Sequence, residues 1–502
     1  MSQLLRTKSI DDLIAASEEP SHRLKKTLGP LSLTALGIGA VIGSGIFTVT
    51  GTAAAGKVLP VKSILDATVL DIALHGVRAG SEMGRPGAGP AITLSFFLVG
   101  LACCFAALCY AELASMIPIA GSAYTYAYAI LGEIFAWIIG WDLILEYAVS
   151  NMSVAVGFSA YLQDLFENVF GFHLPAQLAF PPVPAPGQPA GLFNVPALII
   201  TMAVTWILVR GVKESAGANT TMVLIKIGAI LVFCFGAAHA INPNHWRPFA
   251  PNGFPGVLTG ASIIFFSYIG FDSVSTAAEE CRRPQRDLPI GIIGTLVACT
   301  ILYASVSLVL TGIRDYHQLG TDSPVADALK ALSMNRLRVI VTAGALMGML
   351  SSLLVYQYGQ ARIWFAMSRD GLLPRMFSVV HDRFKTPHIS TWIAGFVVGV
   401  PAGIWDIDTF AELSNIGTLF AFILVSLGVI VLRHKQPDRK RSFRVPFVPV
   451  TPLISVVCCL VLMAGLPLLT WLRFFSWLVI GLVIYFVYSK ARSTLADVAV
   501  KR

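Results

Sequence analysis

The residues whose types and spacing most clearly suggest a binding role are three small ones in the middle of an apolar segment. Residues 33–55 read LTALGIGAVIGSGIFTVTGTAAA, long enough to cross a bilayer, with Gly43, Ser44 and Gly45 near the centre. A helix in lipid satisfies its own backbone hydrogen bonds, so a break is tolerated only where it lines a cavity or binds something. A helical half that starts near Ile46 would direct free N–H groups and its positive dipole end at the gap. This arrangement suits a carboxylate and predicts a small-molecule transporter.

A second apolar segment carries a comparable interruption. Residues 257–278 contain ASIIFFSYIGFDSVSTAA, in which Ser267, Gly270 and Asp272 interrupt a helical apolar run. Paired broken helices are the best sequence indication of a midplane binding site in a secondary transporter. The alternatives are structural: Gly39 and Gly43 form a GxxxG pattern that permits close helix packing, and the second segment is then a simple glycine kink.

Lys226 is the second candidate for chemistry. It lies in TTMVLIKIGAILVF, about nine residues inside an apolar span and so roughly 13–14 Å from its start. A lysine at this depth is costly and is expected to face the bundle interior, near carbonyls released by the first break. Burial disfavours the charged ammonium, which would let Lys226 release and regain a proton during transport. The alternative is a snorkelling or purely structural lysine.

Four further acidic residues and one arginine lie inside or at the ends of apolar spans. Asp142 and Glu146, in GWDLILEY, share one helix face and either favour a cation path or bond to neighbouring helices. Glu112 and Arg362 are candidates for an inner gate or for plain interfacial roles. Asp272 either holds the second break open or caps the half-helix that follows it.

Composition places these residues in an integral membrane protein. The 502 residues are 55% hydrophobic and 13% charged, far too apolar for a soluble globule. Windows of about 20 apolar residues predict an all-α fold of twelve transmembrane helices. The expected spans are 32–54, 91–115, 134–166, 195–212, 217–241, 256–278, 289–312, 337–367, 389–405, 410–432, 449–469 and 471–489.

The distribution of basic residues predicts the orientation. With both termini on one side, that side carries 24 Lys and Arg residues in its loops and tails, against 10 on the other. The positive-inside rule then places both termini in the cytoplasm of a multi-pass plasma-membrane protein. The net charge of +8 lies in these loops, so we expect no nucleic-acid partner. No metalloprotease or triad-like motif is present in the sequence, so an enzyme is not expected, and neither a cofactor nor a metal is implied.

The two interruptions fall five spans apart, in spans one and six, which suggests inverted repeats. We expect a cytoplasmic amphipathic segment at residues 1–30, a transport core at 31–434 and two peripheral spans with a cytoplasmic tail at 435–502. The core would pair spans one to five with spans six to ten. Residues 57–88 form an expected external insertion with a helical segment, KSILDATVLDIALHGVRAG.

Several longer motifs give the chain a family resemblance. They are HRLKKTLGPLSLTALGIGAVIGSGIF (22–47), FAALCYAELASMIPIAGSAYTYAYA (105–129), GWDLILEYAV (140–149), FFSYIGFDSVSTAAEECRRPQRDLPIGI (265–292) and AMSRDGLLP (366–374). Together they resemble the amino acid–polyamine–organocation transporter superfamily, in its bacterial cationic-amino-acid-transporter-like branch. The long 57–88 segment departs from that pattern, because relatives join spans one and two by a short link. It would be a lid, a partner contact or a tolerated insertion.

The resemblance implies a five-plus-five inverted-repeat bundle, with helices one and six broken, and proton-coupled uptake of L-amino acids. In such proteins the substrate carboxylate meets the first break and its amino group meets carbonyls of the second. A span-five lysine takes the place that a sodium ion fills in sodium-coupled relatives. The matching residues here are Ile42, Gly43, Ser44 and Gly45 for the first break, Phe266, Ser267 and Ile269 for the second, and Lys226 for proton coupling.

The resemblance also implies that carbonyls of Gly39 and Ile42 neighbour Lys226. Phe266, Ile269 and the facing stretch of span eight, including Tyr356 and Gln357, are candidates for side-chain selectivity. The expected partners are thus a small L-amino acid, protons and the lipid bilayer. The alternatives are a sodium-coupled or exchange carrier, or an amino-acid sensor that does not transport.

Overall fold

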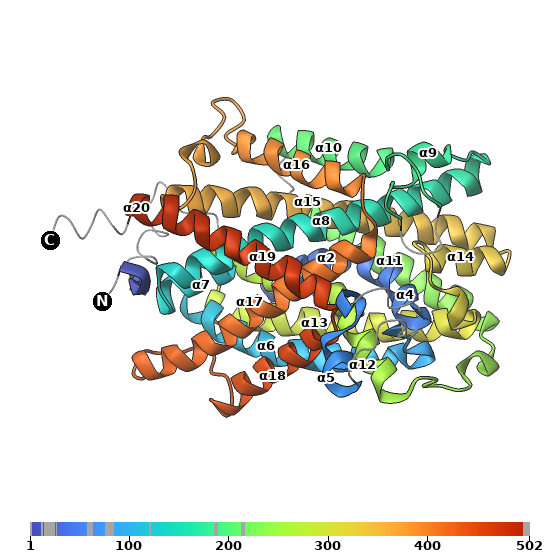
Figure 1. Cartoon of the computed structure of the whole chain (residues 1–502), viewed down its shortest axis with the longest axis horizontal. Helices are drawn as coiled ribbons and strands as arrows, with labels where there is room; N and C mark the ends of the chain where they lie inside the picture. The colour runs from blue at the N-terminus through green and yellow to red at the C-terminus, as the bar shows by residue number, and fades with distance from the viewer. Residues whose placement is uncertain are drawn as a thin grey trace.

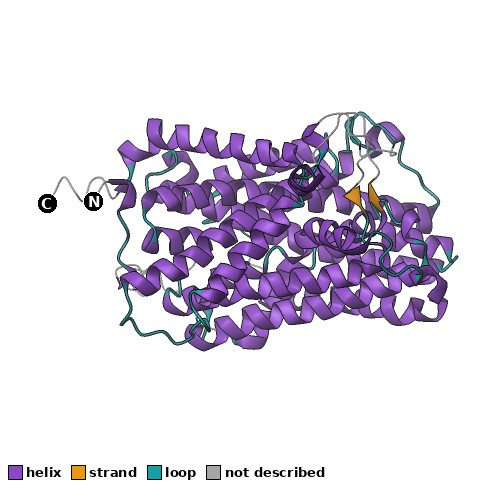
Figure 2. Cartoon of the chain, turned by 60° about the horizontal axis from the view of Figure 1, so that its bottom comes forward, coloured by secondary structure: helices purple, strands orange, loops and turns teal. Residues whose placement is uncertain are grey.

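The computed structural model describes residues 3–11, 14, 26, 28–57, 64–75, 85–119, 122–184, 189–211 and 216–494. These residues are mostly helical, with one pair of two-residue strands far from the termini (Figure 2). The first described helix and the last lie at the same end of the bundle (Figure 1), which we call the terminal end; the other is the far end. That both ends of the chain face the cytoplasm stays a prediction.

The first half of the expected core opens with an interrupted helix. Its main helices are α2 (Pro30–Val41), α3 (Ser44–Phe47), α4 (Val49–Ala55), α6 (Ile92–Met116), α7 (Ser122–Ile130), α8 (Glu133–Phe170), α10 (Val195–Val209) and α11 (Ala216–Ala237). The second half opens in the same way. Its helices are α12 (Gly253–Ile264), the 3₁₀ helices η6 (Phe265–Tyr268) and η7 (Phe271–Glu280), α13 (Pro284–Ile313), α15 (Asn335–Arg369), α16 (His388–Ala402) and α17 (Ile407–Lys435).

The remaining elements are peripheral or short. The peripheral helices are α18 (Val450–Ala464) and α19 (Leu468–Ile484), which continues through the π-helical turn η10 (Tyr485–Ser489) into α20 (Lys490–Arg492). The connecting segments contain η1 (Gln3–Leu5), β1 (Gly56–Lys57), η2 (Ile64–Asp66), α5 (Val69–His75), β2 (Arg85–Pro86), η3 (Gly89–Ala91), α9 (Ala176–Ala179), η4 (Ala238–Ala240), η5 (Pro243–Trp246), η8 (Tyr316–Gln318), α14 (Pro324–Ala331) and η9 (Arg375–Ser378).

Eight helical stretches in the described part of the chain are long and apolar enough to cross a membrane. They coincide with expected spans two, three, five, six, seven, eight, ten and twelve. The expected spans one, four, nine and eleven contain shorter apolar helices: α2, α10, α16 and α18. A helix of 15 residues rises only about 22 Å, which is less than a hydrocarbon core of about 30 Å. The mostly helical fold with several helices able to span a membrane is therefore confirmed, whereas the number twelve stays a prediction.

The boundary between the last two spans differs from the one expected. The sequence windows end one span at 469 and begin the next at 471, but α18 ends at Ala464 and α19 begins at Leu468. Gly465 and Pro467 form the turn, since Pro467 precedes the first helical residue and cannot continue the preceding helix. Trp471 to Arg473 lie inside α19, where hydropathy alone shows no turn.

Two long helices form the frame of the molecule. Helix α8 has 38 residues and α15 has 35, and the two run side by side along the long axis (Figure 1). At about 1.5 Å per residue both exceed the thickness of a hydrocarbon core, as their long apolar runs predict. Near the far end, buried Arg338 of α15 binds Asp164 of α8, and Thr342 donates to the same carboxylate at 3.1 Å.

Helix α19 is fixed to α8 by tryptophans. Trp141 donates its indole N–H to the carbonyl of Trp477 at 2.8 Å, and Trp477 donates to the carbonyl of Trp141 at 3.1 Å. The two rings stack with centroids 4.4 Å apart, and Trp141 also stacks on Trp137, with centroids 5.7 Å apart. Trp137 also donates to the carbonyl of Gly481 at 2.9 Å. This contact joins the third expected span to the twelfth.

The expected insertion is anchored at the far end of the bundle. Strands β1 and β2 pair antiparallel, with Lys57 opposite Arg85. The guanidinium of Arg85 binds Glu412 of α17 at 2.6 Å. The segment before α5 contacts the turn between α18 and α19, where Leu468 donates to the carbonyl of Ala67 and Val69 to that of Leu466. The helix expected over 62–80 is seen as η2 and α5; residues 58–63 and 76–84 lie outside the described residues.

Candidate functional site

The first interruption lies where the small residues predict it. Helix α2 ends at Val41, Ile42 leaves the helical conformation, and α3 begins at Ser44. The second half-helix therefore starts two residues earlier than the expected Ile46. It bends again at Thr48 before α4, because the Thr48 side chain bonds back to the carbonyl of Ser44 at 2.6 Å.

The second interruption lies at Ile269 and Gly270. Helix α12 tightens into η6, Ile269 is extended, and Gly270 has φ +111°, a conformation that favours glycine. Helix η7 then follows with buried Asp272 in its first turn. Both expected breaks are thus confirmed as breaks, while their roles in binding stay proposals.

The two interruptions touch one another. A Cβ atom added to Gly45 would lie 2.7 Å from the Cα atom of Ser267 and 2.6 Å from its Oγ. A Cβ atom on Gly43 would lie 3.0 Å from Ser352 Oγ of α15. The glycines of the first break are therefore needed for close approach of backbone segments, and the gap is closed in this arrangement.

Lys226 of α11 reaches the first break. Its side chain is fully buried, and Nζ donates to the carbonyls of Gly39 at 2.7 Å and Ile42 at 2.9 Å. These are the two neighbours that the resemblance implies, so the contact is confirmed. Ser352 also donates toward the Ile42 carbonyl, at 3.3 Å. The last turn of α2 is thus held by an amine and a hydroxyl where its helical hydrogen bonds end.

Two tyrosine hydroxyls donate hydrogen bonds to backbone carbonyls of the second break. Tyr303 of α13 donates to the carbonyl of Ser267 at 2.8 Å and lies 3.1 Å from that of Val41, so its oxygen bridges the two breaks. Tyr356 of α15 donates to the carbonyl of Ile269 at 3.1 Å. The carbonyl of Phe266 accepts the N–H of Ile269 at 3.3 Å.

Two hydroxyls at the breaks are buried without a hydrogen-bond partner among the described residues: Ser44 Oγ and Ser267 Oγ. Their side chains are at most 1% exposed. Buried polar atoms in native proteins are nearly always paired, so two unpaired hydroxyls, one on each break, indicate a place for a polar ligand or water.

The remaining ionisable candidates divide into two groups. Asp142 and Glu146 are buried, and three of their four carboxylate oxygens have no hydrogen-bond partner in the described part of the chain. Glu112 instead forms a bidentate ion pair with Arg433 at 2.7 and 2.9 Å and also approaches Arg441. Glu112 therefore binds the last turn of α17 and the segment that follows it, which favours a structural role, while Arg362 stacks on the Tyr358 ring.

The side-chain amide of Gln357 forms its described hydrogen bonds with residues outside the breaks. It accepts from Asn151 of α8 at 3.2 Å and donates to Thr205 of α10 at 2.6 Å. Of the two residues of span eight named as selectivity candidates, Tyr356 alone has a described hydrogen bond to a break.

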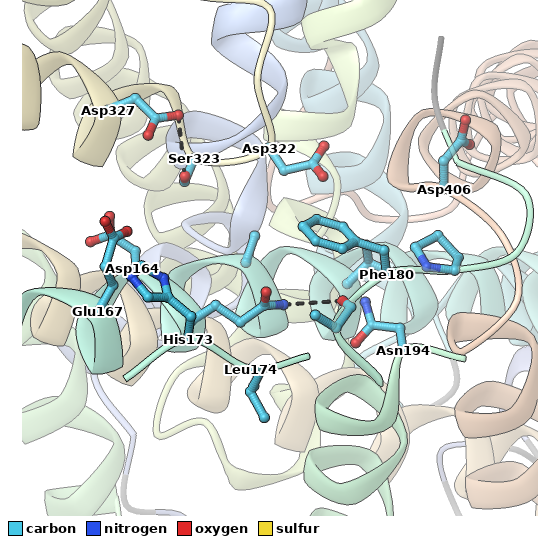
Figure 3. Close-up of a pocket in the computed structure, with 15 residues that line it drawn as sticks. Asp164, Glu167, His173, Leu174, Phe180, Asn194, Asp322, Ser323, Asp327 and Asp406 are labelled. Atoms are coloured by element: carbon cyan, nitrogen blue, oxygen red, sulfur yellow. Dashed lines mark hydrogen bonds between the residues drawn. The ribbon is translucent and has the colours of Figure 1, made fainter. Parts of the chain in front are cut away.

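A cavity of about 320 Å³ is lined by residues of α8, α9 and α14 (Figure 3), and α9 and α14 lie at the far end of the bundle (Figure 1). Five carboxylates and one imidazole belong to its wall: Asp164, Glu167, Asp322, Asp327, Asp406 and His173. Asp164 and Glu167 are matched by Arg338 and Lys330. Its lining contains none of the residues of either break, so the cavity is separate from the candidate site.

Sequence reasoning missed Tyr303 and Ser352. Both lie in apolar helices where a tyrosine or serine is unremarkable, and only tertiary packing brings them to the breaks. The one available signal is weak: each is a hydroxyl well inside a predicted span, and both helices carry several other polar residues.

A helical membrane protein with two abutting broken helices and a buried lysine bound to one of them has the construction of a secondary transporter. Comparison with known proteins agrees: the family model described as amino acid permease matches residues 28–489. The chain belongs to this family, whose members are transporters and not enzymes.

Among relatives, the methylthioribose transporter of Bacillus subtilis (strain 168) is 46% identical over 496 residues, covering 99% of this chain and all of the relative. The branched-chain amino acid permease BcaP of the same organism is also 46% identical, covering 98% and 99% of the two chains. The vacuolar cationic amino acid transporter 4 of Arabidopsis thaliana is 36% identical over 87% of this chain and 68% of its own length.

Proposed function

We propose that the protein is a proton-coupled symporter that carries L-amino acids across the plasma membrane by alternating access. The observation that carries this proposal is the contact of buried Lys226 with the carbonyls of Gly39 and Ile42 at the first break. A cation at this place holds the end of α2, whereas a neutral amine, with one proton fewer, holds it less strongly. Gain and loss of that proton would then bias the bundle between its two arrangements.

The substrate backbone is assigned to the two breaks. The N–H groups of the first break, at Gly43, Ser44 and Gly45, would bind the carboxylate, with Ile42 at the edge of the site; the N–H of Gly43 donates to the carbonyl of Val41 at 3.0 Å and would have to turn to the substrate. Carbonyls of Phe266, Ser267 and Ile269 would bind the ammonium group. The unpaired hydroxyls of Ser44 and Ser267 support this assignment, because a zwitterion between the breaks would give each a partner.

Branched-chain amino acids are the first substrates to test. The name of BcaP points to them, while the equally similar methylthioribose transporter adds a sugar-like candidate that carries no amino group. The experiment measures uptake of labelled leucine into proteoliposomes, with and without a pH gradient. Each of the other nineteen amino acids, and methylthioribose, is added in turn as a competitor. Uptake of labelled methylthioribose with no uptake of any labelled amino acid would contradict the amino-acid assignment.

We predict that Lys226→Ala abolishes proton-driven uptake while the protein stays folded. Without the ammonium group the carbonyls of Gly39 and Ile42 lose their donor, and the proton gradient has no group to act on. The measurement is leucine uptake driven by an imposed pH gradient, with the exposed Lys330→Ala variant as a matched control.

The alternatives give different results in the same vesicles. Undiminished gradient-dependent uptake in Lys226→Ala would refute the role of the lysine. A sodium requirement at fixed pH, or uptake only against internal amino acid, would indicate a sodium-coupled carrier or an exchanger. Tight binding without flux would indicate a sensor.

A further inference from the structure

We propose that the Tyr356 hydroxyl is a built-in competitor of the substrate, occupying the ammonium acceptor at Ile269 until the substrate displaces it. The proposal rests on the proposed amino-acid site at the breaks and adds a residue that sets its apparent affinity. In effect, the side chain of Tyr356 is a latch that keeps the empty site closed.

The position of Tyr356 suits such a latch. Its hydroxyl donates to the carbonyl of Ile269 at 3.1 Å, and Ile269 is the extended residue at which the second span is interrupted. Four residues earlier on the same face of α15, Ser352 donates toward the Ile42 carbonyl of the first break. Helix α15 thus contacts both interruptions with hydroxyl groups one turn apart.

Tyr356 and the substrate would compete for space as well as for the Ile269 carbonyl, because the Tyr356 ring is bulky and buried. The side chain is 7% exposed, and its ring packs edge-on against Tyr147 of α8 with centroids 5.9 Å apart. A carbonyl can accept two hydrogen bonds. The phenol ring of Tyr356, however, fills the space that a second donor to the Ile269 carbonyl would need. An ammonium group would reach the Ile269 carbonyl only after Tyr356 rotates away.

The chemistry favours the substrate once it arrives. A phenol is a neutral donor, and such hydrogen bonds contribute modestly to a folded state. An ammonium group forms charge-assisted hydrogen bonds that are roughly twice as strong. The latch therefore lowers affinity without preventing binding, because only the unlatched fraction of molecules is ready to accept substrate.

The test is Tyr356→Phe, which keeps the ring and removes only the hydroxyl. Equilibrium binding of labelled leucine to purified protein should tighten about fivefold, since removing one neutral hydrogen bond shifts the latch equilibrium by about that factor. Tyr147→Phe is the matched control: it removes a hydroxyl from the packed neighbour, and its affinity should equal that of the wild type. Unchanged binding in Tyr356→Phe, or weaker binding, would overturn the proposal, the latter because the hydroxyl would then be a substrate ligand.

A second measurement needs no substrate. Amide hydrogen exchange across residues 265–275 should speed up in Tyr356→Phe relative to wild type and Tyr147→Phe, because the second break loses a hydrogen bond to α15. Equal exchange in all three proteins would refute the latch even if leucine is transported. Wild-type protein that binds none of the amino acids would instead contradict the proposed function, while the exchange result would still decide whether Tyr356 restrains the break.

Discussion

Gly45 shows how one missing side chain determines the geometry of the candidate site. Its Cα lies so close to Ser267 that an added Cβ would meet backbone as well as side-chain atoms. Backbone atoms of a packed helix cannot move aside as a flexible side chain can. The contact between the two interruptions therefore depends on glycine here for reasons of space.

We predict that Gly45→Val blocks amino-acid binding by forcing the first break away from Ser267. The protein should still reach the membrane, because the long helices do not depend on this contact. Gly228→Val is a suitable control, since a Cβ on Gly228 of α11 meets nothing within 4 Å. Wild-type leucine affinity in Gly45→Val would count against the site.

Part of the site is readable from sequence at this scale. Gly43 to Gly45 and Gly270 indicate the breaks because backbone freedom is a local property, and the depth of Lys226 indicates a buried partner because lipid penalises a charge. The bridge through Tyr303 could not be read in this way. Its hydroxyl reaches Val41 and Ser267, residues distant in sequence, only because α13 packs against both broken helices.

The contact between α8 and α19 belongs to the scale of elements. A Cβ atom on Gly481 would lie 2.3 Å from the ring of Trp141, which itself stacks on Trp137 and on Trp477. A shift of the Trp141 ring would disturb both stacks and its hydrogen bond to Trp477.

We therefore expect Gly481→Ala to separate α19 from α8 and to destabilise the protein by about 1–3 kcal/mol, the usual range for overpacking. The thermal unfolding midpoint in detergent should fall, while Gly228→Ala should leave it unchanged. An unaltered midpoint in Gly481→Ala would show that the tryptophan stack is dispensable.

Element boundaries were harder to predict than element types. Apolar runs of about 20 residues identify spans because every backbone group in lipid must be satisfied within the helix. Hydropathy places the turn at Gly465 to Pro467 several residues too late because α18, the turn and α19 are all apolar. In such a stretch, proline is a better guide to a boundary than hydropathy is.

At the scale of the whole molecule, the insertion between the first two spans joins three distant parts of the chain. It begins at β1 and ends at β2, which pair with one another. Its Arg85 forms an ion pair with Glu412 of α17, and its backbone bonds to the turn between α18 and α19. Thr470 of α19 donates to the same Glu412 at 2.9 Å. The insertion is thus fastened to the rim of the far end, which neither the sequence pattern nor the resemblance predicts.

Deletion of residues 58–84 tests what this fastening does. Because Lys57 lies opposite Arg85 in an antiparallel pair, an Asn-Gly turn can reconnect the strands without moving them. We expect leucine uptake to persist, because no described residue of the insertion reaches either break, and the unfolding midpoint to fall modestly as the contacts with Leu466 and Leu468 disappear. Loss of uptake in a protein of normal stability would instead indicate an essential lid.

The reciprocal bonds between Trp141 and Trp477 have a consequence for the surrounding lipid. Any displacement of α8 relative to α19 would have to give up both indole hydrogen bonds and the ring stack at once. We therefore expect the two helices to travel together through a transport cycle. The acyl chains that solvate α19 would then keep the same protein neighbours throughout, so bilayer thickness on that flank should have little influence on turnover.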